Sequence, residues 1–211
     1  MSRFHEVDFL VSAAAPEQFP ADAGAEVAFA GRSNAGKSSA INAIVQRQAL
    51  ARTSKMPGRT RLLNFFALGA GRRLVDLPGY GYASAPEAER RRWPALIDAL
   101  RARRALRGLF LVVDVRRGLG EEDMGLVAWA RPDQGVHVLL SKADKLGRGA
   151  GAAALKAAQA RLAGRGSAQL FSALTGTGVR EAQDRLVGWL SAVKDPGGSS
   201  PPGQTNPAQV S

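Results

Sequence analysis

The chain contains no cysteine and no long hydrophobic run, and both absences exclude classes of protein; it also has comparatively few acidic residues. Without cysteine there is no disulfide framework, no thiolate metal site and no cysteine nucleophile. The longest strongly apolar run, residues 109–113, ends at Asp114 and is far shorter than the roughly 20 residues of a membrane-spanning helix. The apolar stretch at residues 9–15 is short and follows Glu6 and Asp8, unlike a signal peptide. We therefore expect a cytoplasmic protein with no membrane contact.

The charge is unbalanced. Lys and Arg number 29 against 18 Asp and Glu, which gives a formal net charge of +11 over 211 residues. Such a balance favours nucleic acid or another polyanion as a partner. Of these cations 23 are Arg and 6 are Lys, so a codon preference for Arg explains the same total without any binding role. Composition alone leaves both interpretations open.

The length fits one domain with short appendages. Residues 195–211 contain four Pro and three Gly and almost no large apolar side chain, so we expect a disordered tail. Residues 1–24 hold one apolar patch and are expected to pack as an extended lead-in on the edge of the domain. The domain itself is expected to span residues 25–194.

Short β-type runs alternate with longer helical stretches within residues 25–194. Strands are predicted at residues 26–30, 62–68, 73–76, 109–114, 136–140 and 168–171. Helices are predicted after Lys37 and at about 86–106, 121–131, 150–163 and 179–193. This alternation is typical of an α/β protein built on a mostly parallel sheet.

A phosphate-loop motif, GxxxxGK[ST], follows the strand predicted at residues 26–30. It consists of Gly31, Arg32, Ser33, Asn34, Ala35, Gly36, Lys37 and Ser38. Its glycines allow backbone amides to turn toward phosphate groups, and the following helix adds the positive end of its dipole. Lys37 is predicted to reach the β- and γ-phosphates, and the Ser38 hydroxyl to ligate Mg2+. A purely structural glycine-rich turn is the alternative, which the preceding strand and following helix disfavour.

A second motif ends the strand predicted at residues 73–76. It consists of Asp76, Leu77, Pro78 and Gly79. The Asp76 carboxylate can hold a magnesium-bound water, and the Gly79 amide can meet the γ-phosphate.

Two motifs at the ends of the last two predicted strands favour guanine over adenine. They are Ser141, Lys142, Ala143 and Asp144, and then Phe171, Ser172 and Ala173. The Asp144 carboxylate can accept two hydrogen bonds from guanine, and adenine lacks that pair of donors. The Lys142 stem would lie over the base, and backbone amides after Phe171 can meet the guanine carbonyl oxygen. The order of the motifs at strand ends therefore predicts a GTP site.

The segment between the phosphate loop and Asp76 carries two threonines. A threonine there fits a switch whose hydroxyl completes the Mg2+ shell only when the γ-phosphate is present. Thr60 is preferred because it directly precedes the next strand, and Thr53 is the alternative. The candidate catalytic residues are Lys37, Thr60 and Gly79, and the candidate Mg2+ ligands are Ser38 and Thr60.

Together these motifs resemble the EngB family of bacterial ribosome-biogenesis GTPases. The resemblance covers residues 8–193 and is carried by EVAFAGRSNAGKSS, ARTSKMPGRTRLLNFF, LVDLPGYGYA, LLSKADKL and FSA. It implies an α/β P-loop fold, a Ras-like GTPase domain with a mixed, mostly parallel six-stranded sheet and one antiparallel strand. It also implies a role in large ribosomal subunit assembly, normal cell division and septation. The additional GTP contacts that it implies are Gly58, Arg59, Thr60, Arg61 and Leu62. Ser141 stands where the family usually has Thr, which keeps the hydroxyl.

The residue after Gly79 is Tyr80, where a Ras-type enzyme has a glutamine that orients the attacking water. A phenol is a poor substitute, so intrinsic hydrolysis is expected to be slow and to depend on a partner or a cation. Asn34 stands where related slow GTPases use an Asn to hold potassium. It either binds K+ or only braces the loop.

Two cationic segments flank the switch motifs. Residues 47–61 contain five Arg or Lys and no acid, and residues 85–107 contain seven Arg and three acids. On the second segment we expect Arg90, Arg91, Arg101 and Arg104 to point outward. Their position favours contact with ribosomal RNA that is coupled to the bound nucleotide.

The protein is thus expected to be a monomeric switch that binds GTP or GDP and a large-subunit precursor. The alternative is a non-switching RNA- or ribosome-binding module with structural GTP.

Overall fold

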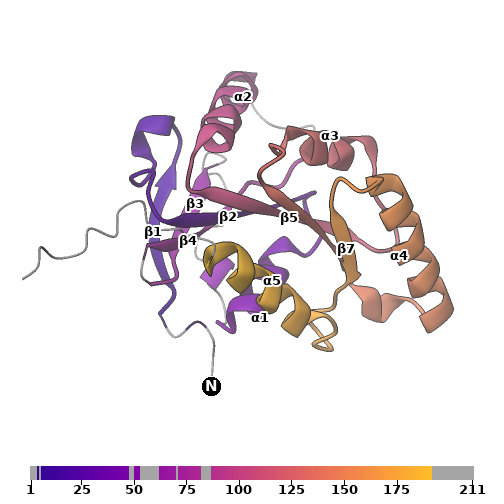
Figure 1. Cartoon of the computed structure of the whole chain (residues 1–211). Helices are drawn as coiled ribbons and strands as arrows, with labels where there is room; N and C mark the ends of the chain where they lie inside the picture. The colour runs from indigo at the N-terminus through magenta and orange to yellow at the C-terminus, as the bar shows by residue number, and fades with distance from the viewer. Residues whose placement is uncertain are drawn as a thin grey trace, which may run out of the picture.

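A seven-stranded sheet lies between two layers of helices (Figure 1). The computed structural model describes residues 4, 6–47, 50–52, 62–69, 71–81 and 87–191, without the side chains of residues 52 and 87–93. The strands are β1 (Asp8–Ala13), β2 (Ala25–Gly31), β3 (Leu63–Ala67), β4 (Arg72–Asp76), β5 (Leu106–Asp114), β6 (Gly135–Ser141) and β7 (Ser167–Leu170). Their order is β1-β3-β4-β2-β5-β6-β7. Only β3 among these strands runs against the rest, because it pairs antiparallel with both of its neighbours.

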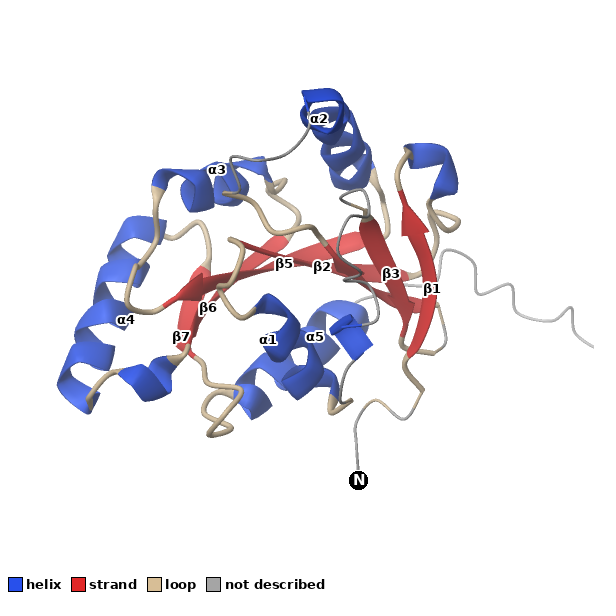
Figure 2. Ribbon diagram, turned by 180° about the vertical axis from the view of Figure 1, so that it is seen from behind, coloured by secondary structure: helices blue, strands red, loops and turns tan. Residues whose placement is uncertain are grey.

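The helices cover both faces of the sheet (Figure 2). They are α1 (Lys37–Val45), α2 (Glu87–Ala102), α3 (Glu121–Trp129), α4 (Arg148–Leu162) and α5 (Val179–Ser191), and the short 3-10 turns are η1 (Pro16–Gln18), η2 (Leu50–Arg52) and η3 (Ala143–Lys145). One apolar cluster packs α2, α3 and α4 on one face, and a second packs α1 and α5 on the other. The central strand β2 is buried along its whole length, as expected of a parallel strand covered on both sides.

The predicted α/β fold with a mostly parallel sheet is confirmed, and the six predicted strands are all present. The predicted strand number is too low by one. Residues 8–13, assigned to the lead-in, form β1, which pairs with β3 and adds an edge strand. A register shift between Phe9 and Val11 interrupts the alternation that would have signalled this strand. The helix predicted at about 86–106 is α2, which continues through Pro94 without a break.

Helix α5 packs on the sheet through Trp189, which needs two glycines beneath it. Gly108 and Gly135 are paired across β5 and β6. A Cβ atom at Gly135 would lie 2.4 Å from Trp189 Nε1, and one at Gly108 would lie 2.5 Å from Trp189 Cε3. The absence of side chains at these two positions therefore lets the indole lie directly on the strands.

We expect Gly135→Ala to lower the free energy of unfolding by about 1–3 kcal/mol, because the added methyl group overpacks the Trp189 contact. Urea unfolding followed by circular dichroism measures this loss. Gly188→Ala in α5 is the matched control, since a Cβ there meets no atom within 4 Å. That change is expected to be neutral or stabilising. Equal stability of Gly135→Ala and the parent would contradict the packing argument.

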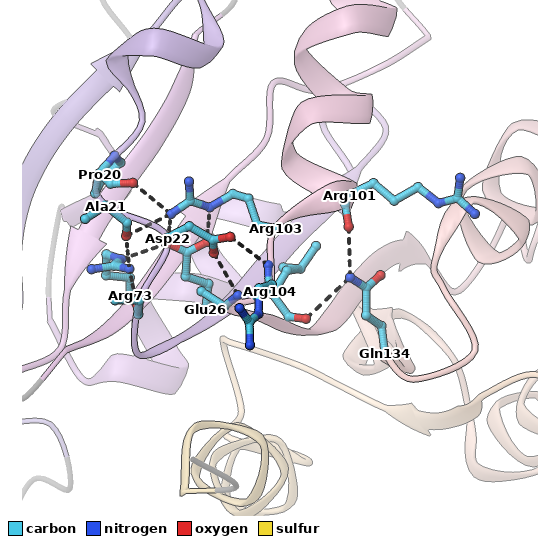
Figure 3. Close-up of polar contacts among 12 residues, drawn as sticks. Pro20, Ala21, Asp22, Glu26, Arg73, Arg101, Arg103, Arg104 and Gln134 are labelled. Atoms are coloured by element: carbon cyan, nitrogen blue, oxygen red, sulfur yellow. Dashed lines mark hydrogen bonds and ion pairs between the residues drawn. The ribbon is translucent and has the colours of Figure 1, made fainter. Parts of the chain in front are cut away.

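The segment before β2 is held by a buried ionic cluster at the N-terminal ends of β2 and β4 (Figure 3). Glu26 is fully buried and accepts hydrogen bonds from Arg103 Nε at 2.6 Å and from Arg73 Nε at 2.8 Å. Both guanidinium groups also donate to the carbonyl oxygen of Ala21. The Asp22 carboxylate accepts from the backbone amides that lead into β5, at 2.9 and 3.0 Å. These contacts join the segment before β2 to the sheet.

Candidate functional site

The phosphate loop connects β2 to α1 at the C-terminal edge of the sheet. Its close packing requires glycine at Gly31, where a Cβ would lie 2.6 Å from the carbonyl oxygen of Val112. Asn34 and Gly36 adopt left-handed backbone conformations, with φ of 63° and 94°. Gly36 is the N-cap of α1 and has no side chain that could compete for the first amides of the helix. These amides and the dipole of α1 form a site suited to an anion.

Lys37 begins α1, and its ammonium group forms an ion pair with Asp76 at the end of β4. Both side chains are almost fully buried. Ser38 follows Lys37 in the first turn of the helix. The Ser38 hydroxyl and the Asp76 carboxylate are hard oxygen donors of the kind that Mg2+ prefers, so they fit this ion.

No group of three or more His, Asp or Glu side chains within the described ranges could hold a metal by itself. Potassium remains a prediction, on Asn34, whose side chain is exposed at the loop.

The strand-end motif of Asp76 to Gly79 lies directly beside the phosphate loop. Leu77 N donates to Phe29 O on β2 at 2.9 Å. A Cβ at Gly79 would lie 3.1 Å from the backbone of Ser33, so this glycine allows close approach of the two loops. The predicted association of these two motifs is thus present in the fold.

The two base-recognition motifs are joined by hydrogen bonds. Ala143 N donates to Phe171 O at 3.0 Å, and Ser172 Oγ donates to the Asp144 carboxylate at 2.6 Å. The hydrogen bond from Ser172 is the main reason that the pKa of the Asp144 carboxyl lies below its ordinary value. The positive charge of the nearby Lys145 lowers this pKa further. Asp144 therefore stays an ionised acceptor, as recognition of two guanine N–H groups requires.

Lys142 links the base-recognition loop to the phosphate loop. Its ammonium group donates to Asn34 O at 2.7 Å and lies 3.0 Å from the Asp114 carboxylate at the end of β5. Arg116 binds the same carboxylate through two nitrogens, at 2.9 and 2.6 Å. The hydrogen bond from Arg116 is the main reason that the pKa of Asp114 lies well below its ordinary value. Asp114, Asn34 and Lys142 line part of a cavity of about 320 Å³.

The sequence reasoning missed Asp114 and Arg116 as supports of Lys142. The signal was available, because Asp114 ends a buried strand at the same edge of the sheet as Asp76 and Ser141. Ser141, the last residue of β6, also makes a contact that was not predicted. Its hydroxyl has the carbonyl oxygens of Ala35 and Val113 within hydrogen-bond distance, at 2.5 and 3.1 Å, and so joins the end of β6 to the phosphate loop.

Several predicted residues lie outside the described residues. They are Thr53, Gly58, Arg59, Thr60 and Arg61, together with the tail at residues 195–211. Leu62 is described and is half-buried just before β3.

The cationic segment at residues 85–107 is divided by the fold. Arg101 and Arg104 are exposed as predicted, but they lie at the C-terminal end of α2, next to the start of β5. The start of β5 lies at the opposite end of the strands from the phosphate loop, which follows the end of β2. The predicted position of these two arginines beside the switch motifs is therefore wrong. Arg103 is buried against Glu26. The side chains of Arg90 and Arg91 are not among those that the structure describes.

Loops after β2, β4, β6 and β7 converge on one edge of the sheet, in the arrangement that defines a P-loop GTPase domain. A family model described as "50S ribosome-binding GTPase" matches residues 26–142. The chain is 50% identical to the probable GTP-binding protein EngB of Azoarcus sp. (strain BH72) over 196 residues, which cover 90% of this chain and 94% of that relative. It belongs to the EngB family of GTP-binding proteins.

Two further comparisons agree. The chain is 52% identical over 182 residues to the probable GTP-binding protein EngB of Methylococcus capsulatus, which covers 83% of this chain and 87% of that relative. A crystal structure of a probable GTP-binding protein EngB has a TM-score of 0.62 at 22% identity and covers 79% of this chain and 99% of that chain. Within the described residues, no helix is both long and apolar enough to cross a membrane.

Proposed function

We propose that this protein is a GTP-hydrolysing switch that acts in assembly of the large ribosomal subunit. The observation that carries the proposal is the convergence of a phosphate loop, an Asp76 motif and an Asp144 motif within a family described as 50S ribosome-binding. In this proposal the protein is monomeric, acts in the cytoplasm and hydrolyses GTP slowly until a ribosomal partner is bound. Its effect on cell division and septation follows from the supply of large subunits.

The residue roles in this proposal follow from the site. Backbone amides of residues 33–38 and the Lys37 ammonium group bind the phosphates. Ser38 and Thr60 would ligate Mg2+ and the Asp76 carboxylate would bind it through a water; the ion would supply charge neutralisation at the β- and γ-phosphates. The Gly79 amide orients the γ-phosphate, and Asn34 is the candidate K+ ligand. Asp144 and the loop of Phe171 to Ala173 select guanine.

We expect Asp144→Asn to weaken GDP binding about 100-fold, because an amide can no longer accept both guanine N–H groups and one donor is left unpaired. Calorimetric titration with GDP measures the loss. Asp133→Asn is the matched control, since Asp133 is exposed, and it is expected to bind GDP as the parent does. Unchanged GDP affinity of Asp144→Asn, or equal affinity of the parent for ADP and GDP, would refute the guanine assignment.

The ribosomal role is tested by sedimentation of the full-length protein with large-subunit particles. We expect more protein to sediment with GTP than with GDP, and the bound fraction to fall steeply with salt because phosphate contacts release counterions. We also expect the particles to accelerate GTP hydrolysis. Equal sedimentation with either nucleotide, together with unaccelerated hydrolysis, would instead support the alternative, a non-switching RNA- or ribosome-binding module in which GTP is structural.

A further inference from the structure

Tyr80, the residue after Gly79, forms hydrogen bonds through both its main chain and its side chain. Its main chain pairs with the phosphate loop, since Ser33 N donates to Tyr80 O at 3.0 Å and Tyr80 N donates to Gly31 O at 3.3 Å. Its phenol donates a hydrogen bond to Oδ1 of Asp123, in the first turn of α3. The main chain is thus held beside the nucleotide site while the ring is held against α3.

Asp123 has a fixed orientation for this contact. Its side chain is buried, and its second oxygen, Oδ2, accepts a hydrogen bond from Gly120 N at 2.7 Å. Burial and the neighbouring Asp123 raise the pKa of the Tyr80 phenol; Glu122 raises it further, and Arg32 opposes the shift. The phenol therefore remains a protonated donor at every pH at which the protein works.

The surroundings of the ring leave it room to move if the hydrogen bond is lost. Tyr80 lines a cavity of about 290 Å³ together with Leu77, Pro78, Leu126 and Trp129. The ring packs against the apolar core on one side and borders this cavity on another, and the hydrogen bond to Asp123 is the directional contact that orients it.

We propose that Asp123 is a positioning residue for GTP hydrolysis, because it holds the Tyr80 ring against α3 and so keeps the space beside Gly79 open for the attacking water. The inference rests on the proposed GTPase function. A released ring would compete with that water, since the Tyr80 main chain stays fixed to the phosphate loop. No linear motif marks Asp123 for this role, since it lies 43 residues from Tyr80 in the chain.

The contact itself is tested by titration of the phenol. Because the chain has two tyrosines, Tyr80 and Tyr82, the Tyr82→Phe variant contains Tyr80 alone. We expect its phenolate absorbance to appear only when the protein unfolds in alkali. With Asp123→Ala added, the phenol is expected to ionise at lower pH in the folded protein, as followed by circular dichroism. An unchanged titration would overturn the proposal, whether or not the protein hydrolyses GTP.

The kinetic consequence is tested with single and double variants of the full chain. We expect Asp123→Ala to lower kcat for GTP about tenfold with little change in KM. Asp123→Asn is expected to stay near the parent value, because its amide can bond both Gly120 N and the Tyr80 oxygen. Adding Tyr80→Ala to Asp123→Ala is expected to restore kcat, since no ring remains to compete with water. A low kcat that the second substitution does not restore would show a merely structural role and overturn the proposal.

These outcomes separate the two proposals. If the parent shows no GTP hydrolysis, with or without large-subunit particles, the proposed GTPase function fails, and the phenol titration alone decides whether Asp123 holds Tyr80. If the parent hydrolyses GTP and Asp123→Ala leaves both kcat and the titration unchanged, only the positioning role fails.

Discussion

Lys37→Ala is expected to weaken GDP and GTP binding at least about 100-fold, because the ammonium group is the charged donor that the first turn of α1 offers to the phosphates. Calorimetry or displacement of a fluorescent GDP analogue measures the loss. Lys156→Ala is the matched control, an exposed lysine on α4 whose loss is expected to leave affinity unchanged. Retention of full affinity by Lys37→Ala would remove the phosphate-loop assignment.

The same substitution also leaves the buried carboxylate of Asp76 without its ion-pair partner. An uncompensated buried charge destabilises a protein, so lost binding could reflect unfolding. The double variant Lys37→Ala with Asp76→Asn removes the charge as well. We expect it to melt nearer to the parent than Lys37→Ala does while binding GDP no better, which separates the two effects.

Arg103→Ala is expected to lower the free energy of unfolding by about 3–5 kcal/mol, because it removes one of the two arginines that, within the described part of the chain, pair with the fully buried Glu26. It also removes the guanidinium group that lies over the rings of Phe19 and Phe65, at 5.5 and 5.9 Å from their centroids. Urea unfolding followed by circular dichroism measures the change.

Arg101→Ala serves as the control for this change, since Arg101 is an exposed residue of the same region. Its effect is expected to stay within about 0.5 kcal/mol. A loss below about 1 kcal/mol for Arg103→Ala would mean that the segment before β2 is held chiefly by other contacts. The cluster lies at the sheet edge away from the phosphate loop, so GDP affinity of the folded variant is expected to match that of the parent.

Much of the fold could be predicted, because its strands are apolar runs bounded by turn residues and its last helix, α5, buries an apolar stripe that includes Ala182, Leu186 and Leu190. Strand β1 escaped prediction because it is largely exposed and irregular in register, so it lacks the alternation of a regular edge strand. The misplacement of Arg101 and Arg104 has a topological cause. A helix that follows one parallel strand must return to the opposite sheet edge before the next, so the two ends of α2 lie far apart.

The candidate site was predictable where one local motif defines a backbone shape, as in the loop around Gly36 or the strand end at Asp76. Partners that meet only through tertiary structure leave no linear motif; at most a strand end such as Asp114 shows which end of the sheet a side chain occupies. The contacts of Lys142 with Asp114 and of Ser172 with Asp144 join segments 28 residues apart in sequence, and neither pair has a spacing that a linear motif records. Periodicity likewise shows that Glu26 lies in a strand but not which arginine neutralises it.

The cavity beside Tyr80 contains a natural fluorophore, the indole ring of Trp129. Trp129 lines this cavity, and its indole Nε1 is buried with no hydrogen-bond partner within the described part of the chain. Indole emission depends on the polarity around the ring, and the chain has only three tryptophans. With Trp93 and Trp189 replaced by phenylalanine, the fluorescence comes from Trp129. Its wavelength of maximum emission would report water entry next to Tyr80 in real time, without any attached dye.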